Sequence, residues 1–257
     1  MNDKNQKNII MSEGGKKLGE ILDALLQFSK PGISLIEIDE LAEKLIIQTG
    51  GSPSFKTVED YKYSTCLSVN DVVVHGIPNK YILKNGDILG IDIGLLYKGF
   101  HTDTSWTKPI GEIDEETKLF LQTGKKALLK AVSRAVAGNR IWDISEAIED
   151  TVRSEGYSPV RQLVGHGIGR NLHEAPQVPC FKRGSRIHSP VLSPGQTIAI
   201  EIIYNQGNFP IVYKNDDGWS IKTEDDSLSG LFEHTVLITP KSPTVLTKNQ
   251  EFDKITI

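Results

Sequence analysis

Apolar side chains recur with the period of an α-helix in several segments of the chain. In the first segment, leucines and isoleucines return every three or four positions and so gather on one helical face. Ser34 and Glu37 have the spacing of a capping box at the start of a second helix, and Asp143 with Glu146 gives a similar start near the middle of the chain. The sequence predicts four helices, over residues 12–29, 34–48, 114–137 and 143–155.

Shorter apolar runs fill the gaps between these helices. They are rich in valine, isoleucine and threonine and are bounded by glycine, proline or asparagine, which is typical of β-strands. The predicted strands cover residues 67–74, 87–96, 100–107, 160–163, 197–203, 209–213 and 231–238. Two helices followed by strands therefore occur twice, which indicates an α+β protein.

The second half of the chain faintly repeats the first. With a shift of 106 residues, Gly32 falls on Gly138 and Gly50 falls on Gly156. A chance match is one explanation. The other is a single domain built from two similar α+β halves, with a cleft at the seam, where ligand sites are common. No low-complexity linker separates the halves, which favours the single domain.

Composition and charge narrow the function classes. The 257 residues carry a net charge of −4, which gives no general attraction to nucleic acid or to an anionic membrane. No apolar run reaches the ~20 residues needed to span a bilayer. Cys66 and Cys180 form no disulfide framework or thiolate zinc motif, and residues 1–10 lack the apolar core of a secretory signal. We therefore expect one cytoplasmic domain over residues 1–257, with a flexible N-terminus over 1–10 and a tail over 240–257.

Two aspartates interrupt a predicted hairpin. Asp92 stands inside an apolar run, and a turn at residues 97–99 would place it opposite Asp103 on the next strand. Two facing carboxylates destabilise a sheet unless one has a raised pKa or a cation lies between them. A solvated hairpin edge with scattered acids is the alternative for this pair alone.

A histidine and two glutamates occur in similarly unusual settings. His166 lies among three glycines within five residues, which allow tight turns around a ring that commonly binds transition metals. Glu201 and Glu233 each interrupt an apolar run, where an unpaired buried carboxylate would be costly. Taken singly, the histidine could be a loop residue without a ligand role, and the glutamates could face water from edge strands.

Considered together, these five residues predict a metal centre. The ordinary explanation is plausible for each one but much less so for all five at once. Oxygen ligands with one imidazole suit Mn, Fe, Co or Zn rather than a structural thiolate zinc site. A pair of ions would explain why so many negative charges converge, and hydrolases use paired ions in this way.

The longer motifs around these residues resemble those of the type I methionine aminopeptidases, which belong to the M24 metallopeptidase family. The resemblance covers about residues 8–240. Its motifs are NDVVVHGIP at 70–78, the Asp92–Asp103 hairpin, GHGIG at 165–169, LHE at 172–174, DGW at 217–219 and FEHT at 232–235. It implies the pita-bread fold, an α+β fold of two pseudo-symmetric halves with a central curved antiparallel sheet flanked by helices.

The resemblance also implies a role for each predicted ligand. Asp92 would chelate one ion, and Asp103 and Glu233 would bridge both. His166 and Glu201 would bind the other ion. Glu201 would in addition be the general base, which takes a proton from water and passes it to the leaving amine.

Further cleft residues follow from the same resemblance. His75 and His173 would contact the scissile amide and stabilise the tetrahedral intermediate, although loop histidines without a role are the alternative. The methionine side chain would enter a pocket lined by Tyr61, Cys66 and Trp219. The implied activity is removal of the initiator methionine from nascent proteins by a monomer with two divalent ions (Co, Mn, Fe or Zn), and docking on ribosomes is left open.

Spacing selects the subtype, and one departure bears on the pocket. Thirty-five residues separate His166 from Glu201, which leaves no room for the long insertion of the type II enzymes. Where the family usually has Pro-Met after Glu201, this chain has Ile202 and Ile203. Two alternatives stay open: an aminopeptidase of the same fold with Xaa-Pro specificity, and a non-catalytic binding module, which would usually lack the metal ligands.

Overall fold

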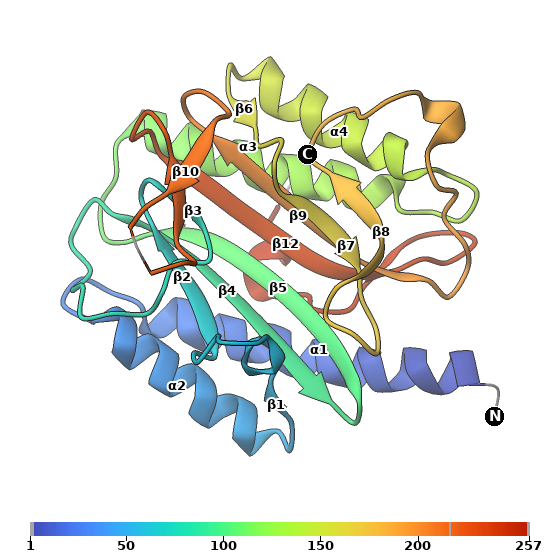
Figure 1. The fold of residues 1–257 in the computed structure, drawn as a ribbon, viewed down its shortest axis with the longest axis horizontal. Helices are drawn as coiled ribbons and strands as arrows, with labels where there is room; N and C mark the ends of the chain where they lie inside the picture. Colours follow the sequence, from blue (N-terminus) through green and yellow to red (C-terminus); the bar gives the residue numbers. More distant parts are fainter. Residues whose placement is uncertain (1–2, 216, 256–257) are drawn as a thin grey trace.

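The computed structural model describes residues 3–215 and 217–255 as helices packed against one large sheet (Figure 1). The helices are α1 (Asp3–Phe28), α2 (Leu35–Gln48), α3 (Glu115–Arg134), α4 (Ile141–Ser154) and α5 (Gln250–Asp253), with short 3-10 turns η1 (Phe55–Thr57) and η2 (Arg186–His188). Within the described ranges, no helix combines the length and the apolar character needed to cross a membrane.

The strands form a ten-stranded sheet and a three-stranded sheet. They are β1 (Ser52–Pro53), β2 (Thr65–Val69), β3 (Val72–Val74), β4 (Ile88–Tyr97), β5 (Phe100–Pro109), β6 (Ser158–Pro159), β7 (Val164–Gly167), β8 (Glu174–Pro179), β9 (Thr197–Asn205), β10 (Ile211–Tyr213), β11 (Ile221–Thr223), β12 (Ser229–Leu237) and β13 (Thr244–Val245). The large sheet has the order β1-β4-β5-β12-β9-β7-β8, with β2, β6 and β13 paired to β4, β9 and β12. The small sheet has the order β10-β11-β3.

Two similar halves share the large sheet, as the repeat predicts. Helix α1 packs on β4 and β5, whereas α3 packs on β9 and β12 (Figure 1). The halves join where β5 pairs with β12 in antiparallel register. Gly32 and Gly138 have φ of 93° and 92°, and Gly50 and Gly156 have φ of 80° and 85°. These left-handed positions favour glycine, so the repeat is present in the backbone as well as in the sequence.

Large aromatic residues of the core pack on the face of the sheet that α1 and α3 cover. Trp106 on β5 and Phe232 on β12 are fully buried, with ring centroids 5.1 Å apart. Phe120 of α3 packs on Tyr204 of β9 with centroids 4.5 Å apart. Because strand side chains alternate between faces, the residues next to Trp106 and Phe232 point away from this core.

The predicted register of the central hairpin is wrong by two residues. Asp92 pairs with Ser105, and Asp103 pairs with Gly94. The turn has only Lys98 and Gly99 at its centre, both with positive φ, as in the two-residue hairpin loops that match strand twist. A shift of two residues keeps every side chain on its predicted face, so the two aspartates still point the same way.

Several predicted boundaries differ from the structure. Helix α1 includes residues 3–10, which were expected to be a flexible N-terminus; this stretch contains no glycine or proline to prevent helix formation. Helix α4 begins at Ile141, because the Asp143 carboxylate accepts the Arg140 N–H at 2.8 Å and so lies in the first turn. Residues 160–163 form no strand but connect β6 to β7. Within the expected tail, residues 244–245 form β13 and residues 250–253 form α5.

Candidate metal centre and substrate cleft

Five acidic and histidine side chains come from five neighbouring strands. Asp92 lies on β4, Asp103 on β5, Glu233 on β12, Glu201 on β9 and His166 on β7. Through Ser105 and Ala199, the strand registers place all five on the same face of the sheet. The structure therefore brings together every residue that the sequence predicts as a metal ligand.

The distances within this cluster are short. Ligand atoms of Asp103, His166 and Glu233 all lie within 4.8 Å of one another. His166 Nε2 lies 3.5 Å from Glu201 Oε1, at the side of that group. Asp92 Oδ1 and Glu233 Oε1 are buried and have no hydrogen-bond partner among the described residues. Unpaired buried oxygens are costly, so these two oxygens point to a cation as the missing partner.

Electrostatics at the centre favour the protonated form of each carboxyl group. Burial, followed by the charges of Asp103 and Glu201, raises the pKa of Asp92 well above its ordinary value. Burial raises the pKa of Asp103 to about 7. Burial and the charge of Asp103 raise the pKa values of Glu201 and Glu233. The fully ionised cluster is therefore unfavourable unless positive charge enters it.

His166 is prepared to act as a neutral ligand. Burial lowers its pKa to about 4, so the ring is uncharged at neutral pH. Its Nδ1 lies 2.8 Å from the carbonyl oxygen of Gly167, and this contact requires the proton to be on Nδ1. The lone pair of Nε2 then points toward Glu201. Backbone carbonyl groups commonly orient metal-binding imidazole rings in this way, by accepting a hydrogen bond from the other ring nitrogen.

The donor set fits divalent transition-metal ions. It combines four carboxyl groups with one neutral imidazole, a mixture typical of Mn, Fe, Co or Zn sites. Positive charge would compensate the converging carboxylates and satisfy the unpaired oxygens of Asp92 and Glu233. The residues present are thus suited to hold metal.

Two more histidines line the same cavity. The ring of His173 lies 4.5 Å from that of His166, at an interplanar angle of 75°. His75 follows β3 with φ of 56°, a left-handed conformation uncommon outside glycine. Burial, with a smaller effect of His173, lowers the pKa of His75 to about 4, and burial also lowers the pKa of His173. Both rings are therefore neutral near pH 7.

An apolar pocket adjoins the cluster within a cavity of about 140 Å³. Tyr61, Cys66 and Trp219, which the sequence analysis places in the substrate pocket, all line it. The Tyr61 hydroxyl donates to the carbonyl oxygen of Thr65 at 2.7 Å and lies 3.2 Å from Cys66 Sγ. The rings of Tyr61 and Trp219 lie 5.0 Å apart at 73°. The pocket thus has aromatic and sulfur-containing walls.

Five apolar residues of the cavity lining were not predicted from the sequence. They are Phe55, Val58, Val74, Leu172 and Leu231. Phe55 contacts the edge of Tyr61 with centroids 6.4 Å apart. An apolar residue in a pocket and one in the core look alike in a hydrophobic pattern. The sequence does contain one indication for Leu172: it directly precedes His173, a predicted site residue.

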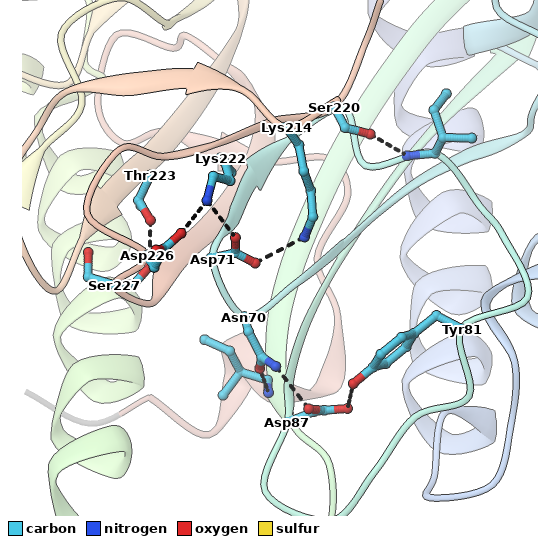
Figure 2. A network of polar contacts seen from close by, with 12 residues as sticks. Asn70, Asp71, Tyr81, Asp87, Lys214, Ser220, Lys222, Thr223, Asp226 and Ser227 are labelled. Carbon is cyan, nitrogen blue, oxygen red and sulfur yellow. Dashed lines mark hydrogen bonds and ion pairs between the residues drawn. The ribbon is translucent and has the colours of Figure 1, made fainter. Parts of the chain in front are cut away.

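A loop and a hairpin hold His75 beside Trp219. The Asp217 carboxylate accepts the N–H groups of Trp219 and Ser220, both at 2.8 Å, and the Ser220 hydroxyl at 2.7 Å. Ser220 Oγ accepts the N–H of Ile77 at 3.2 Å, two residues beyond His75 (Figure 2). Hydrogen bonds therefore connect the loop that carries Trp219 to the segment that follows His75.

Ion pairs strengthen this connection. Asp71, which precedes β3, lies 3.0 Å from Lys214 Nζ and 3.8 Å from Lys222 Nζ, both on the β10–β11 hairpin (Figure 2). Asn70 donates to Asp87 at 2.9 Å, and Asp87 also accepts the Tyr81 hydroxyl at 2.9 Å. These contacts fix both ends of the segment that carries His75.

The chain is similar to known metallopeptidases over most of its length. The model of metallopeptidase family M24 matches residues 10–240. A methionine aminopeptidase of Clostridium perfringens is 42% identical over 245 residues, which cover 95% of this chain and 97% of the relative. Methionine aminopeptidase 1 of Bacillus subtilis is 41% identical over 239 residues, 93% of this chain and 95% of its own.

Solved structures give the same result for the fold. The methionine aminopeptidase of Thermotoga maritima matches with a TM-score of 0.91 and 36% identity over 97% of this chain and 98% of its own. The prolidase of Pyrococcus furiosus matches with a TM-score of 0.77 but only 21% identity, and the match covers 95% of this chain and 64% of that one. The second likeness shows a shared fold alone.

Proposed function

Since the chain belongs to metallopeptidase family M24 and is a hydrolase that removes N-terminal methionine, we propose that it works with two divalent metal ions. Asp92 would hold one ion, Asp103 and Glu233 both, and His166 and Glu201 the other. The observation that carries this proposal is the convergence of these five side chains from adjacent strands, with two buried carboxylate oxygens unpaired among the described residues.

Bound ions would supply Lewis acidity, which polarises a carbonyl group and lowers the pKa of water. The protein contributes the proton transfers. Glu201 lies at the edge of the cluster, 3.5 Å from His166 Nε2 and facing the cavity. Its raised pKa suits a general base, which accepts a proton from water and delivers it to the leaving amine.

The neutral histidines would act on the scissile bond. A neutral imidazole N–H donates a hydrogen bond without adding a full charge, so it can stabilise an oxyanion that forms only in the transition state. His173 stands beside His166, and His75 stands beside the Trp219 pocket wall. We propose that one of these two histidines, His173 or His75, contacts the substrate amide and that the other stabilises the developing oxyanion.

The pocket would select methionine as the first residue. Tyr61 and Trp219 provide aromatic surfaces, against which a thioether packs favourably. Cys66 is fully protonated in this setting, because burial and then the charge of Asp92 raise the pKa of its thiol well above the ordinary value. Cys66 therefore serves as a small apolar wall rather than as a nucleophile.

We further propose that the substrates are the N-termini of nascent proteins in the cytoplasm and that the chain acts as a monomer. The named activity of the bacterial relatives supports the first part. Action at the ribosome follows from that substrate class, since new N-termini emerge there.

The test combines metal analysis with a panel of peptides that begin with methionine, alanine or proline. We expect two ions per chain, release of methionine from a Met-Ala-Ser peptide, and loss of activity by roughly 10²–10⁴ in Glu201→Gln. Glu224→Gln, an exposed change on the hairpin, serves as the control with unchanged turnover. Normal turnover in Glu201→Gln contradicts the assigned base. Release of alanine or proline indicates an aminopeptidase of different N-terminal specificity, and a metal-free inactive chain indicates a binding module.

A further inference from the structure

The C-terminal segment at residues 244–249 lies against the strand that carries Glu233. Strand β13 pairs with β12, where Val245 faces Val236 and Thr244 faces Leu237. The Leu246 N–H then donates to the Thr235 carbonyl at 2.9 Å. The segment therefore follows β12 toward the metal centre.

Helix α1 holds this segment in place from the other side. A Cβ on Gly15 would lie 2.6 Å from the Leu246 carbonyl oxygen, and one on Gly19 would lie closer still to that of Lys248. Real Cβ contacts are essentially never under 3.0 Å. The two helical glycines thus give the C-terminal backbone room to pass between α1 and β12.

This path buries the hydroxyl of Thr247 next to the ligand strand. Thr247 is fully buried. Its Oγ1 accepts the N–H of Thr235 at 3.1 Å and lies 3.1 Å from Nδ1 of His234. His234 and Thr235 are the two residues that directly follow Glu233. One hydroxyl therefore fixes both positions beside a candidate ligand.

Further hydrogen bonds lead from these positions to Asp103, the other residue proposed to hold both ions. The Thr235 hydroxyl accepts the N–H of Asp103 at 2.9 Å and donates to the carbonyl oxygen of Asp103 at 2.8 Å. The Thr104 hydroxyl donates to the carbonyl oxygen of Glu233 at 2.8 Å and lies 3.1 Å from His234 Nδ1. The backbones of Asp103 and Glu233 are thus held by the hydroxyl groups of Thr235 and Thr104, and Thr247 contacts the Thr235 N–H and the His234 ring between them.

We infer that Thr247 is a positioning residue for the metal centre. By orienting His234 and Thr235, its hydroxyl sets how the Asp103 and Glu233 carboxylates converge. This inference rests on the proposed metal function. Removal of a group that orients a metal ligand typically lowers metal affinity by 10–100-fold. A variant without the Thr247 hydroxyl should therefore keep its fold and bind metal more weakly.

The test compares Thr247→Val, which replaces the hydroxyl by a methyl group, with Thr247→Ser, which keeps it. Metal-free proteins are titrated with Mn²⁺ by calorimetry at 25 °C, and their thermal unfolding is recorded. We expect about tenfold weaker Mn²⁺ binding in Thr247→Val and a change below about threefold in Thr247→Ser. The d–d absorption of the Co²⁺ form should change in Thr247→Val alone.

Leu246→Val is the matched control, because it shortens a buried side chain in the same segment without touching the hydroxyl. It should lower the thermal midpoint of the metal-free protein and leave Mn²⁺ affinity unchanged. If Thr247→Val behaves like Leu246→Val, Thr247 is merely structural and the inference is overturned.

If Thr247→Val does not fold, Thr247→Ala removes the hydroxyl without adding a methyl group against His234, and the same outcomes decide. Absence of Mn²⁺ binding by the unmodified chain overturns the proposed metal function itself.

Discussion

The carboxyl groups of the candidate metal centre bind protons more tightly than ordinary carboxyl groups do. Burial raises the pKa of Asp103 to about 7, and burial also raises the pKa values of Asp92, Glu201 and Glu233 above their ordinary values. His166 behaves in the opposite way, because burial lowers its pKa to about 4. Protons and metal ions therefore compete for the carboxylates, while the imidazole stays free to bind.

This competition predicts that metal affinity rises with pH. A protonated carboxyl group cannot bind metal, so each proton released on binding tightens the dissociation constant by about tenfold per pH unit. With the pKa of Asp103 at about 7, at least one proton should leave between pH 6 and 8. His166 contributes none in this range. The Mn²⁺ dissociation constant, measured by calorimetry in two buffers of different ionisation enthalpy, checks the sign.

A constant affinity from pH 6 to pH 8, with no buffer-dependent heat, would contradict proton release. The matched control is Glu201→Gln, which lacks one titrating carboxyl group. It should bind more weakly and show a shallower pH dependence than the unmodified chain.

At the scale of elements, the sequence predicts side-chain faces better than it predicts register. The alternation of polar and apolar residues places Asp92 and Asp103 on one face, and that holds in the structure. The exact pairing depends on whether the turn contains two or three residues, which is set by the backbone of Lys98 and Gly99. The metal-ligand candidates could be predicted because a two-residue error preserves the face.

Other elements depend on contacts that a local pattern does not contain. The segment at 244–253 has little periodicity, and its structure comes from β12, from α1 and from Phe252 packing on His234 with ring centroids 4.7 Å apart. The pocket residues Phe55 and Val58 likewise become neighbours of the metal centre only through the fold. Local sequence patterns therefore do not predict the secondary structure of the C-terminal segment or all the residues that line the pocket.

Helix α1 offers a test of the contact with the C-terminal segment. Alanine favours a helix over glycine by about 1 kcal/mol, so propensity alone predicts that Gly19→Ala stabilises the protein. The added Cβ would overlap the Lys248 carbonyl oxygen, and overpacking typically costs about 1–3 kcal/mol. We expect net destabilisation of up to about 2 kcal/mol, measured by urea unfolding. Gly14→Ala, whose Cβ would lie 3.2 Å from Cβ of Tyr97, is the control and should be near neutral. A stabilised Gly19→Ala would show that the C-terminal segment does not press on α1.

At the scale of the whole molecule, the metal centre spans the seam between the two halves. Asp92 and Asp103 belong to the half with α1 and α2, whereas His166, Glu201 and Glu233 belong to the half with α3 and α4. The halves already share the β5–β12 pairing. Ions bound at this seam would add direct links between the halves and would offset the repulsion among their carboxylates.

This arrangement predicts that metal stabilises the entire fold. A ligand that binds only the native state at about 100 times its dissociation constant adds about 2.7 kcal/mol. For a chain of this size, each kcal/mol raises the thermal midpoint by about 2–4 °C, so Mn²⁺ or Co²⁺ should raise it by roughly 5–10 °C, and EDTA should reverse the effect. Glu224→Gln should respond like the unmodified chain, whereas Glu201→Gln should respond less at the same metal concentration. Equal thermal midpoints with metal and with EDTA would mean that the five side chains converge without holding an ion, because any binding confined to the native state must shift the unfolding equilibrium.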